Sequence, residues 1–197
     1  MSQAITRVPQ EERTRLMRAR LLDATVDLLV ERGFAGTSTT LVAERAGASR
    51  GALLHHFPSK NDLVVAAVEH VMAARGAELE RAAAAGVRDT RGVLELLAEH
   101  VTSKVFTAAL ELWVAARTDD VLRAAVVPLE QKVGRETHRL TVRLLGADES
   151  RAGVRELVQA TLDLARGLAL AATFSDDGRR RGHILDQWAA VLDKELR

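Results

Sequence analysis

The chain has 197 residues, of which 47% are hydrophobic and 28% are charged, with a formal net charge of +1 and no cysteine. This length and balance are typical of a globular protein with one or two domains. The absence of cysteine excludes disulfides, a thiolate nucleophile and zinc sites with cysteine ligands. No apolar run reaches the roughly 18 residues of a membrane span, and the first residues lack the apolar stretch of a secretory signal. We therefore expect a cytoplasmic protein.

The fold is predicted to be all-α. Apolar residues recur at the three- and four-residue spacing of helices, and alternating strand patterns are missing. The first helix is expected over 14–32, and Gly33 is its predicted left-handed stop. Further helices are expected over 39–46, 50–56, 59–85, 90–104, 107–118, 120–145, 150–174 and 179–196.

Residues 38–60 carry the most specific pattern in the chain. Ser38 and Ser49 are each placed to cap a short helix, and Gly47 between them permits the left-handed turn that separates the two helices. Pro58 ends the second of them. Two short helices joined by such a turn form a helix-turn-helix, which lays its second helix in the major groove of DNA.

The second short helix is predicted to have an inner and an outer side. Leu53 and Phe57 lie about one turn apart and are expected to anchor the helix on Val42, Leu21 and Leu28. The residues left outside, together with polar residues at nearby helix starts, are the predicted DNA contacts: Ser38, Thr39, Thr40, Ser49, Arg50, Gly51, Ala52, Leu54, His55, His56 and Lys60.

The roles within this set differ. Arg50 is a long donor at the start of the helix, and arginine can bond guanine at two positions. Gly51 and Ala52 permit close approach to the duplex, while His56 and Lys60 are expected to contact phosphates. The alternatives are that the hinge is an ordinary helix connection and that Arg50 is only a solvated charge. Adjacent histidines point about 100° apart on a helix, so no metal site is expected there.

Five motifs follow one another in this region: Gly33-Phe34, Thr37-Ser38, Val42-Ala43, Ala46-Gly47-Ala48-Ser49 and Leu53-Leu54-His55-His56-Phe57-Pro58-Ser59-Lys60. In this order they resemble the N-terminal domain of the TetR family of transcriptional repressors, over roughly residues 18–71. One position departs, because Leu54 stands where the family usually has a tyrosine that contacts phosphate. The resemblance implies a dimer that represses promoters, with a C-terminal helical domain that binds a small-molecule inducer. Because the two recognition helices of a dimer must reach half-sites spaced by whole turns of DNA, a palindromic operator is expected.

Two domains are expected. A helix-turn-helix DNA-binding domain covers 14–62, and a helical effector-binding and dimerisation domain covers 63–197. Ser59 and Asp62 are spaced as in a capping box and begin the helix that links the two domains. The predicted architecture is therefore an N-terminal three-helix unit joined by a linking helix to a C-terminal bundle.

Polar and aromatic residues interrupt an otherwise aliphatic run between positions 90 and 145, which favours a small-molecule pocket among those helices. The candidate lining residues are His100, Thr102, Lys104, Phe106, Thr107, Glu111 and Trp113. Two alternatives remain open. Trp113 is a core residue in one, and in the other Glu111 pairs with Arg117 or another surface cation.

The last two predicted helices carry apolar residues on more than one side. A helix that is apolar on two sides is buried on two sides, so the pair is expected to form a four-helix interface with a second copy of the chain. The predicted interface residues are Leu157, Thr161, Leu164, Leu168, Ile184, Trp188 and Leu192. The alternative is that both sides belong to the core of a monomer.

The leading interpretation is a ligand-responsive, dimeric and sequence-specific repressor, whose partners are a double-stranded DNA operator, a second copy and an unidentified small-molecule effector. An architectural DNA binder would instead bind with little sequence preference and a strong dependence on salt. An enzyme is not expected, because no Gly-rich phosphate loop and no metal-spaced cluster of histidines and carboxylates occur. No metal, cofactor or membrane partner is expected.

Overall fold

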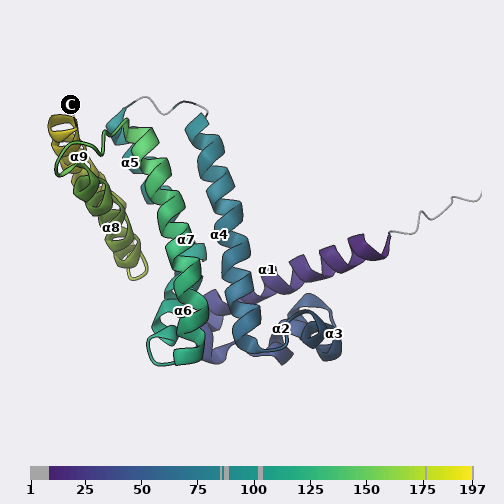
Figure 1. Ribbon diagram of the computed structural model, residues 1–197. Helices are drawn as coiled ribbons and strands as arrows, with labels where there is room; N and C mark the ends of the chain where they lie inside the picture. Colours follow the sequence, from purple (N-terminus) through teal and green to yellow (C-terminus); the bar gives the residue numbers. More distant parts are fainter. Residues whose placement is uncertain (1–8, 85, 87–88, 102–103, 176, 197) are drawn as a thin grey trace, which may run out of the picture.

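The computed structural model describes residues 9–84, 86, 89–101, 104–175 and 177–196. Within them the chain is all-helical, as the sequence predicted. Figure 1 shows α2 and α3 beside α1 at one end of the molecule and the α8–α9 pair at the other. No helix in this part of the chain combines the length and the apolarity that crossing a bilayer requires. The helices are α1 (Gln10–Gly36), α2 (Thr39–Ala46), α3 (Arg50–His56), α4 (Lys60–Ala84), α5 (Thr90–Val101), α6 (Lys104–Ala116), α7 (Asp120–Leu145), α8 (Val154–Ala172) and α9 (Gly178–Glu195).

The two short helices begin at side-chain caps. Ser38 Oγ accepts a hydrogen bond from the Leu41 N–H at 3.3 Å, and Ser49 Oγ accepts one from the Ala52 N–H at 3.1 Å. Gly47 adopts φ 63° and ψ 38°, a left-handed conformation that a side chain would disfavour. These contacts confirm the predicted caps and the predicted hinge.

The linking helix α4 begins at a reciprocal contact. The Asp62 N–H donates to Ser59 Oγ at 3.1 Å, and that hydroxyl donates to Asp62 Oδ2 at 2.7 Å. One backbone donor of the first turn, which has no partner within the helix, is thereby satisfied. The contact confirms the capping pattern predicted at the start of this helix.

α1 is longer than predicted at both ends. It begins at Gln10 rather than at 14, because Pro9 occupies the position just before the first turn, where its missing N–H is not needed. Gly33 breaks the helix as predicted, with φ 69° and ψ 177°, but a short helical segment follows and ends at Gly36.

Several boundaries of the C-terminal helices also differ from the predicted ones. α6 begins at Lys104, where the sequence predicted the preceding helix to end, and α7 has its predicted bounds. Thr102, a predicted pocket residue, and Ala85, the predicted end of α4, lie outside the described residues. α8 begins at Val154 rather than at 150, because Gly153 adopts a left-handed φ of 84° just before it.

One apolar core joins the N-terminal unit to the rest of the molecule. Leu21, Leu28 and Leu53 are buried in it together with Phe57, as predicted, and Leu112 of α6 belongs to the same cluster. Each fully buried leucine contributes about 1.5–3 kcal/mol of transfer free energy. Because residues of α4, α6 and α7 complete this core, the predicted division between 62 and 63 crosses continuous packing, and it stays a prediction.

Candidate DNA-binding surface and effector cavity

α3 presents its first residues to solvent while its inner side is anchored. Leu53 is 0% exposed and Phe57 is 3% exposed. Arg50, Gly51 and Leu54 are exposed on the outer side. Arg50 has no hydrogen bond or ion pair with any residue that the structure describes. The helix therefore offers an unengaged guanidinium beside a glycine, on a segment held by a buried leucine.

Polar side chains surround this outer side. They come from the starts of α2 and α3 and from the end of α3. Hydroxyl and imidazole groups in such places can bond phosphates, which fixes a protein on a duplex without reading its sequence. The exposed or half-buried members are Ser38, Thr39, Thr40, Ser49, His55 and His56, and the methyl group of Ala52 is half-buried beside Gly51.

Lys60 is engaged inside the protein. Its Nζ donates to the carbonyl oxygen of Phe34 at 2.6 Å and lies 4.0 Å from the centroid of the Phe34 ring. Burial lowers the pKa of Lys60, because the ammonium loses part of its hydration there. The predicted phosphate contact therefore requires Lys60 to leave Phe34, and the structure gives this side chain a bracing position between α4 and the end of α1.

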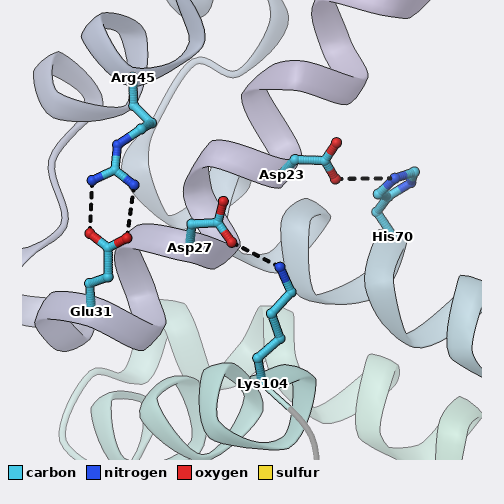
Figure 2. Close-up of polar contacts among 6 residues, drawn as sticks. All are labelled: Asp23, Asp27, Glu31, Arg45, His70 and Lys104. Carbon is cyan, nitrogen blue, oxygen red and sulfur yellow. Dashed lines mark hydrogen bonds and ion pairs between the residues drawn. The ribbon is translucent and has the colours of Figure 1, made fainter.

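Three carboxylates spaced four residues apart on α1 each reach a different helix. Figure 2 shows the pairs: Glu31 with Arg45 of α2, Asp27 with Lys104 of α6, and Asp23 with His70 of α4. The Arg45 guanidinium donates to both oxygens of Glu31, at 2.9 and 2.8 Å. Because these pairs are exposed to water and salt, each contributes little to stability. The apolar core, rather than these pairs, holds α1 against α2, α4 and α6.

A partly buried hydrogen bond joins α6 to the break in α1. The Phe34 N–H donates to Glu111 Oε2 at 3.0 Å. Gly33 is required at this place, because its φ is positive and because an added Cβ would lie 2.7 Å from the same carboxylate oxygen. Glu111 therefore bonds the backbone of Phe34. It does not pair with Arg117, and it does not face a cavity.

A cavity of about 410 Å³ lies among α4, α5, α6, α7 and α8. His100, Phe106 and Trp113 line it, as predicted, whereas Thr107 and Glu111 do not. Those two residues are one turn apart on another side of α6, so the prediction that they line the cavity is corrected. Lys104, also considered for the pocket, pairs instead with Asp27.

The cavity wall is aromatic on one side and carries a carboxylate on another. The Phe106 and Trp113 rings pack edge to face with centroids 5.8 Å apart. Glu130 of α7 is half-buried there, and burial raises its pKa, an effect that Trp113 and Arg166 offset only in part. Burial also lowers the pKa of His100. Both shifts disfavour the charged form, as expected of groups removed from water.

The sequence missed what α4 and α8 contribute to this cavity. α4 adds Met72, Ala73 and Gly76, and α8 adds Leu162 and Ala165. Small and aliphatic side chains of this kind look the same in a sequence whether they face a cavity or a solid core. No local pattern could therefore have identified them.

The α8–α9 pair has a buried side and an open side. Thr161, Leu168 and Leu192 are 1%, 4% and 0% exposed within a single chain, so their side chains are not available to a second copy. The two leucines pack with residues of α5, and Thr161 accepts a hydrogen bond from Trp188 Nε1 at 2.9 Å. The prediction that these three residues form an interface is corrected. A shallow groove remains open, lined by Leu164, Arg180, His183, Ile184, Gln187, Trp188 and Val191.

Comparison with known proteins agrees with this geometry. Residues 21–67 match the family model of bacterial regulatory proteins, tetR family. The HTH-type transcriptional regulator CymR of Pseudomonas putida is 31% identical over 181 residues, which cover 87% of this chain and 86% of CymR. The chain belongs to the TetR family. It is therefore a transcriptional regulator of the helix-turn-helix type.

Other transcriptional regulators match along most of the chain. The HTH-type transcriptional regulator BetI of Pseudomonas paraeruginosa is 29% identical over 191 residues, covering 92% of this chain and 93% of BetI. The crystal structure of a transcriptional regulator from Rhodococcus sp. Rha1 has a TM-score of 0.70 at 24% identity, covering 89% of this chain and 95% of that one. The likeness in fold thus extends well beyond the helix-turn-helix.

Proposed function

We propose that this TetR-family regulator is a dimeric repressor that binds a palindromic operator through α3 and releases it when a small molecule occupies the cavity. The observation that carries the proposal is α3, a helix capped by Ser49 and anchored by Leu53, with the unengaged Arg50 on its outer side. A helix held in this way can enter a major groove with its first residues against base edges. The cytoplasm, where a bacterial operator lies, is its expected location.

The proposed contacts divide into two kinds. Arg50 bonds a guanine, and the methyl group of Ala52 meets a thymine methyl beside Gly51. Leu54 makes an apolar contact with the sugar-phosphate backbone of the DNA, at the place where a tyrosine hydroxyl would have bonded a phosphate. The remaining polar residues position the protein on phosphates: Ser38, Thr39, Thr40, Ser49, His55 and His56, with Lys60 joining them if it leaves Phe34.

Dimerisation is proposed through the open side of α8 and α9. Two copies are needed because half-sites lie about 34–36 Å apart, or a multiple of that distance. Of the predicted residues, Leu157, Leu164, Ile184 and Trp188 are still available in part. Leu170, Phe174 and Val191, on or just after these two helices, are large apolar side chains left exposed, and together they support an interface there.

Coupling between the cavity and the DNA-binding unit is proposed to pass through α6. One side of α6 carries Phe106 and Trp113 of the cavity wall, and another carries Glu111, which holds the Phe34 N–H. A ligand that displaces α6 therefore changes how α1 is held. Release of DNA further requires that the ligand binds one of the two arrangements more tightly than the other.

Selection of bound fragments from random DNA with the purified protein tests the proposal. The expected result is a palindromic motif whose half-sites are separated by whole turns of the duplex. Binding that varies little with sequence and falls steeply with salt would instead establish the architectural alternative. A motif with one half-site would contradict the dimeric arrangement.

A further inference from the structure

The cavity contains a carboxylate without an ion-pair partner. Glu130 lines it and is half-buried, and no ion pair among the described residues includes Glu130. The cationic side chains that line the same cavity are already paired with other carboxylates: Arg75 with Glu78 at 2.8 Å, Lys132 with Glu69 at 3.5 Å, and Arg166 with Asp163 at 2.6 Å. Glu136 also lines the cavity without an ion pair among the described residues, but it is exposed to water. Glu130 is therefore the lining carboxylate that combines partial burial with the lack of an ion pair among those residues.

Hydrogen bonding compensates this charge only in part. The indole N–H of Trp113 is near enough to favour the Glu130 carboxylate, yet it makes no hydrogen bond of normal geometry to any described atom. Burial lowers the pKa of His100, another residue of the lining, and so disfavours a positive charge on it. A positively charged group brought into the cavity would supply the compensating charge for Glu130 that Trp113 and His100 do not provide.

The aromatic wall favours the same kind of group. The rings of Phe106 and Trp113 meet at 82°, so they present differently oriented surfaces along one stretch of α6. Ring faces carry negative charge density and attract cations within about 6 Å of their centroids. The rest of the lining includes Met72, Leu97 and Leu129, which suit the apolar body of a ligand.

We propose that the cavity binds an organic cation with a compact apolar body, and that its charge lies between the Glu130 carboxylate and the rings of Phe106 and Trp113. The role of this ligand as the effector of the regulator rests on the proposed function. The binding of a cation by the cavity does not. A volume of about 410 Å³ admits a small molecule of this class.

Calorimetry with the full chain tests the charge preference. Three probes share a benzyl group and differ in charge: benzyltrimethylammonium, its neutral carbon isostere neopentylbenzene, and phenylmethanesulfonate. The expected order places the cation about tenfold or more tighter than the neutral compound and the anion last. Equal affinity for the cation and the neutral isostere, or tighter binding of the anion, overturns the proposal.

Two variants locate the charge. Glu130→Gln should weaken binding of the cation about tenfold or more and leave the neutral compound unaffected, and that unchanged affinity also shows that the cavity has kept its shape. The matched control is Glu136→Gln, which changes an exposed carboxylate of the same helix and cavity and should weaken the cation less than about threefold. A Glu130→Gln variant that binds the cation as tightly as the parent overturns the assignment. If that variant does not fold, the three-probe comparison on the parent chain decides.

DNA binding is measured separately, so that the two proposals fail in different ways. Failure of the parent chain to select any operator would end the proposed function and leave the calorimetric result standing. If an operator is found, saturating benzyltrimethylammonium should weaken its binding in the parent chain and leave it almost unchanged in Glu130→Gln. Cation binding that leaves operator affinity unchanged in the parent would overturn the effector role.

Discussion

The backbone N–H of Phe34 and the carboxylate of Glu111, 77 positions apart in the chain, meet in a hydrogen bond of 3.0 Å. Phe34 follows the break in α1, and its carbonyl oxygen is held from the other side by Lys60. Both polar groups of this residue are thus held by side chains, one from α6 and one from α4. The end of the first helix of the DNA-binding unit is fixed by two helices that also line or border the cavity.

Removal of the Glu111 acceptor should destabilise the protein. In Glu111→Ala the partly buried Phe34 N–H loses its partner, which costs about 1–3 kcal/mol. Glu111→Gln keeps an acceptor oxygen at the same reach and should cost less. Urea unfolding followed by circular dichroism measures both. Equal losses in the two variants would show that the charge of Glu111 matters and the hydrogen bond does not.

Gly33→Ala should also destabilise the protein, for a different reason. A side chain at φ 69° and ψ 177°, a region that almost only glycine occupies, is strained by about 1–3 kcal/mol, and its Cβ would lie 2.7 Å from Glu111 Oε2. The matched control is Gly182→Ala, inside α9, where nothing lies within 4 Å of an added Cβ. That change should stabilise the helix by about 0.5–1 kcal/mol. Thermal unfolding of both variants should move in opposite directions, and a shared direction would contradict this assignment of strain.

The N-terminal unit could be predicted closely because its determinants are local. Ser38 and Ser49 each bond an N–H three positions ahead, and the left-handed turn depends on Gly47 alone. The contacts that hold this unit against the rest of the protein are not local. Lys60 reaches Phe34 across 26 positions and Glu111 reaches it across 77, and no spacing rule relates residues so far apart.

The C-terminal part was predicted less well, because periodicity shows that a helix side is buried and not what covers it. Leu168 and Leu192 lie on apolar stripes, but α5 of the same chain covers them. Glu130 was missed for the converse reason. In a sequence, a carboxylate within a long helix is predicted to face solvent. Glu130 lies at the cavity only because α7 packs beside α6 and α4.

Arg50→Ala should relax the preference for one base pair in each half-site. Loss of an arginine that bonds guanine at two positions costs about 1–3 kcal/mol of discrimination at that pair and little elsewhere. Competition between the selected operator and single-base variants measures this. Arg123→Ala is the matched control, since Arg123 is an exposed arginine of α7 that pairs with Asp120. A uniform loss on all sequences with Arg50→Ala would mean that Arg50 contacts phosphate only.

Ile184→Arg should separate the proposed dimer without unfolding its chains. Ile184 lines the open groove on α9, and a charge placed there would be buried without a partner in the interface. Leu192→Ala makes the contrasting change, because Leu192 is 0% exposed within one chain and its truncation should cost about 2–5 kcal/mol of stability. Sedimentation velocity and thermal unfolding distinguish the two effects. A dimer that persists in Ile184→Arg would place the interface elsewhere.

Glu130→Gln should make the protein more stable at neutral pH and change it little in acid. Burial raises the pKa of Glu130 above its ordinary value of 4.5, so the folded state keeps this proton at pH values where the unfolded state has released it. Stability is therefore undiminished below pH 4.5 and falls as the pH rises through the folded-state pKa, and a glutamine removes that fall. Thermal midpoints measured at increasing pH from below 4.5 should show a difference between variant and parent that grows as the pH rises. Glu136→Gln, at an exposed position, should change the midpoint little throughout. A difference that stays constant with pH would mean that Glu130 carries no burial cost.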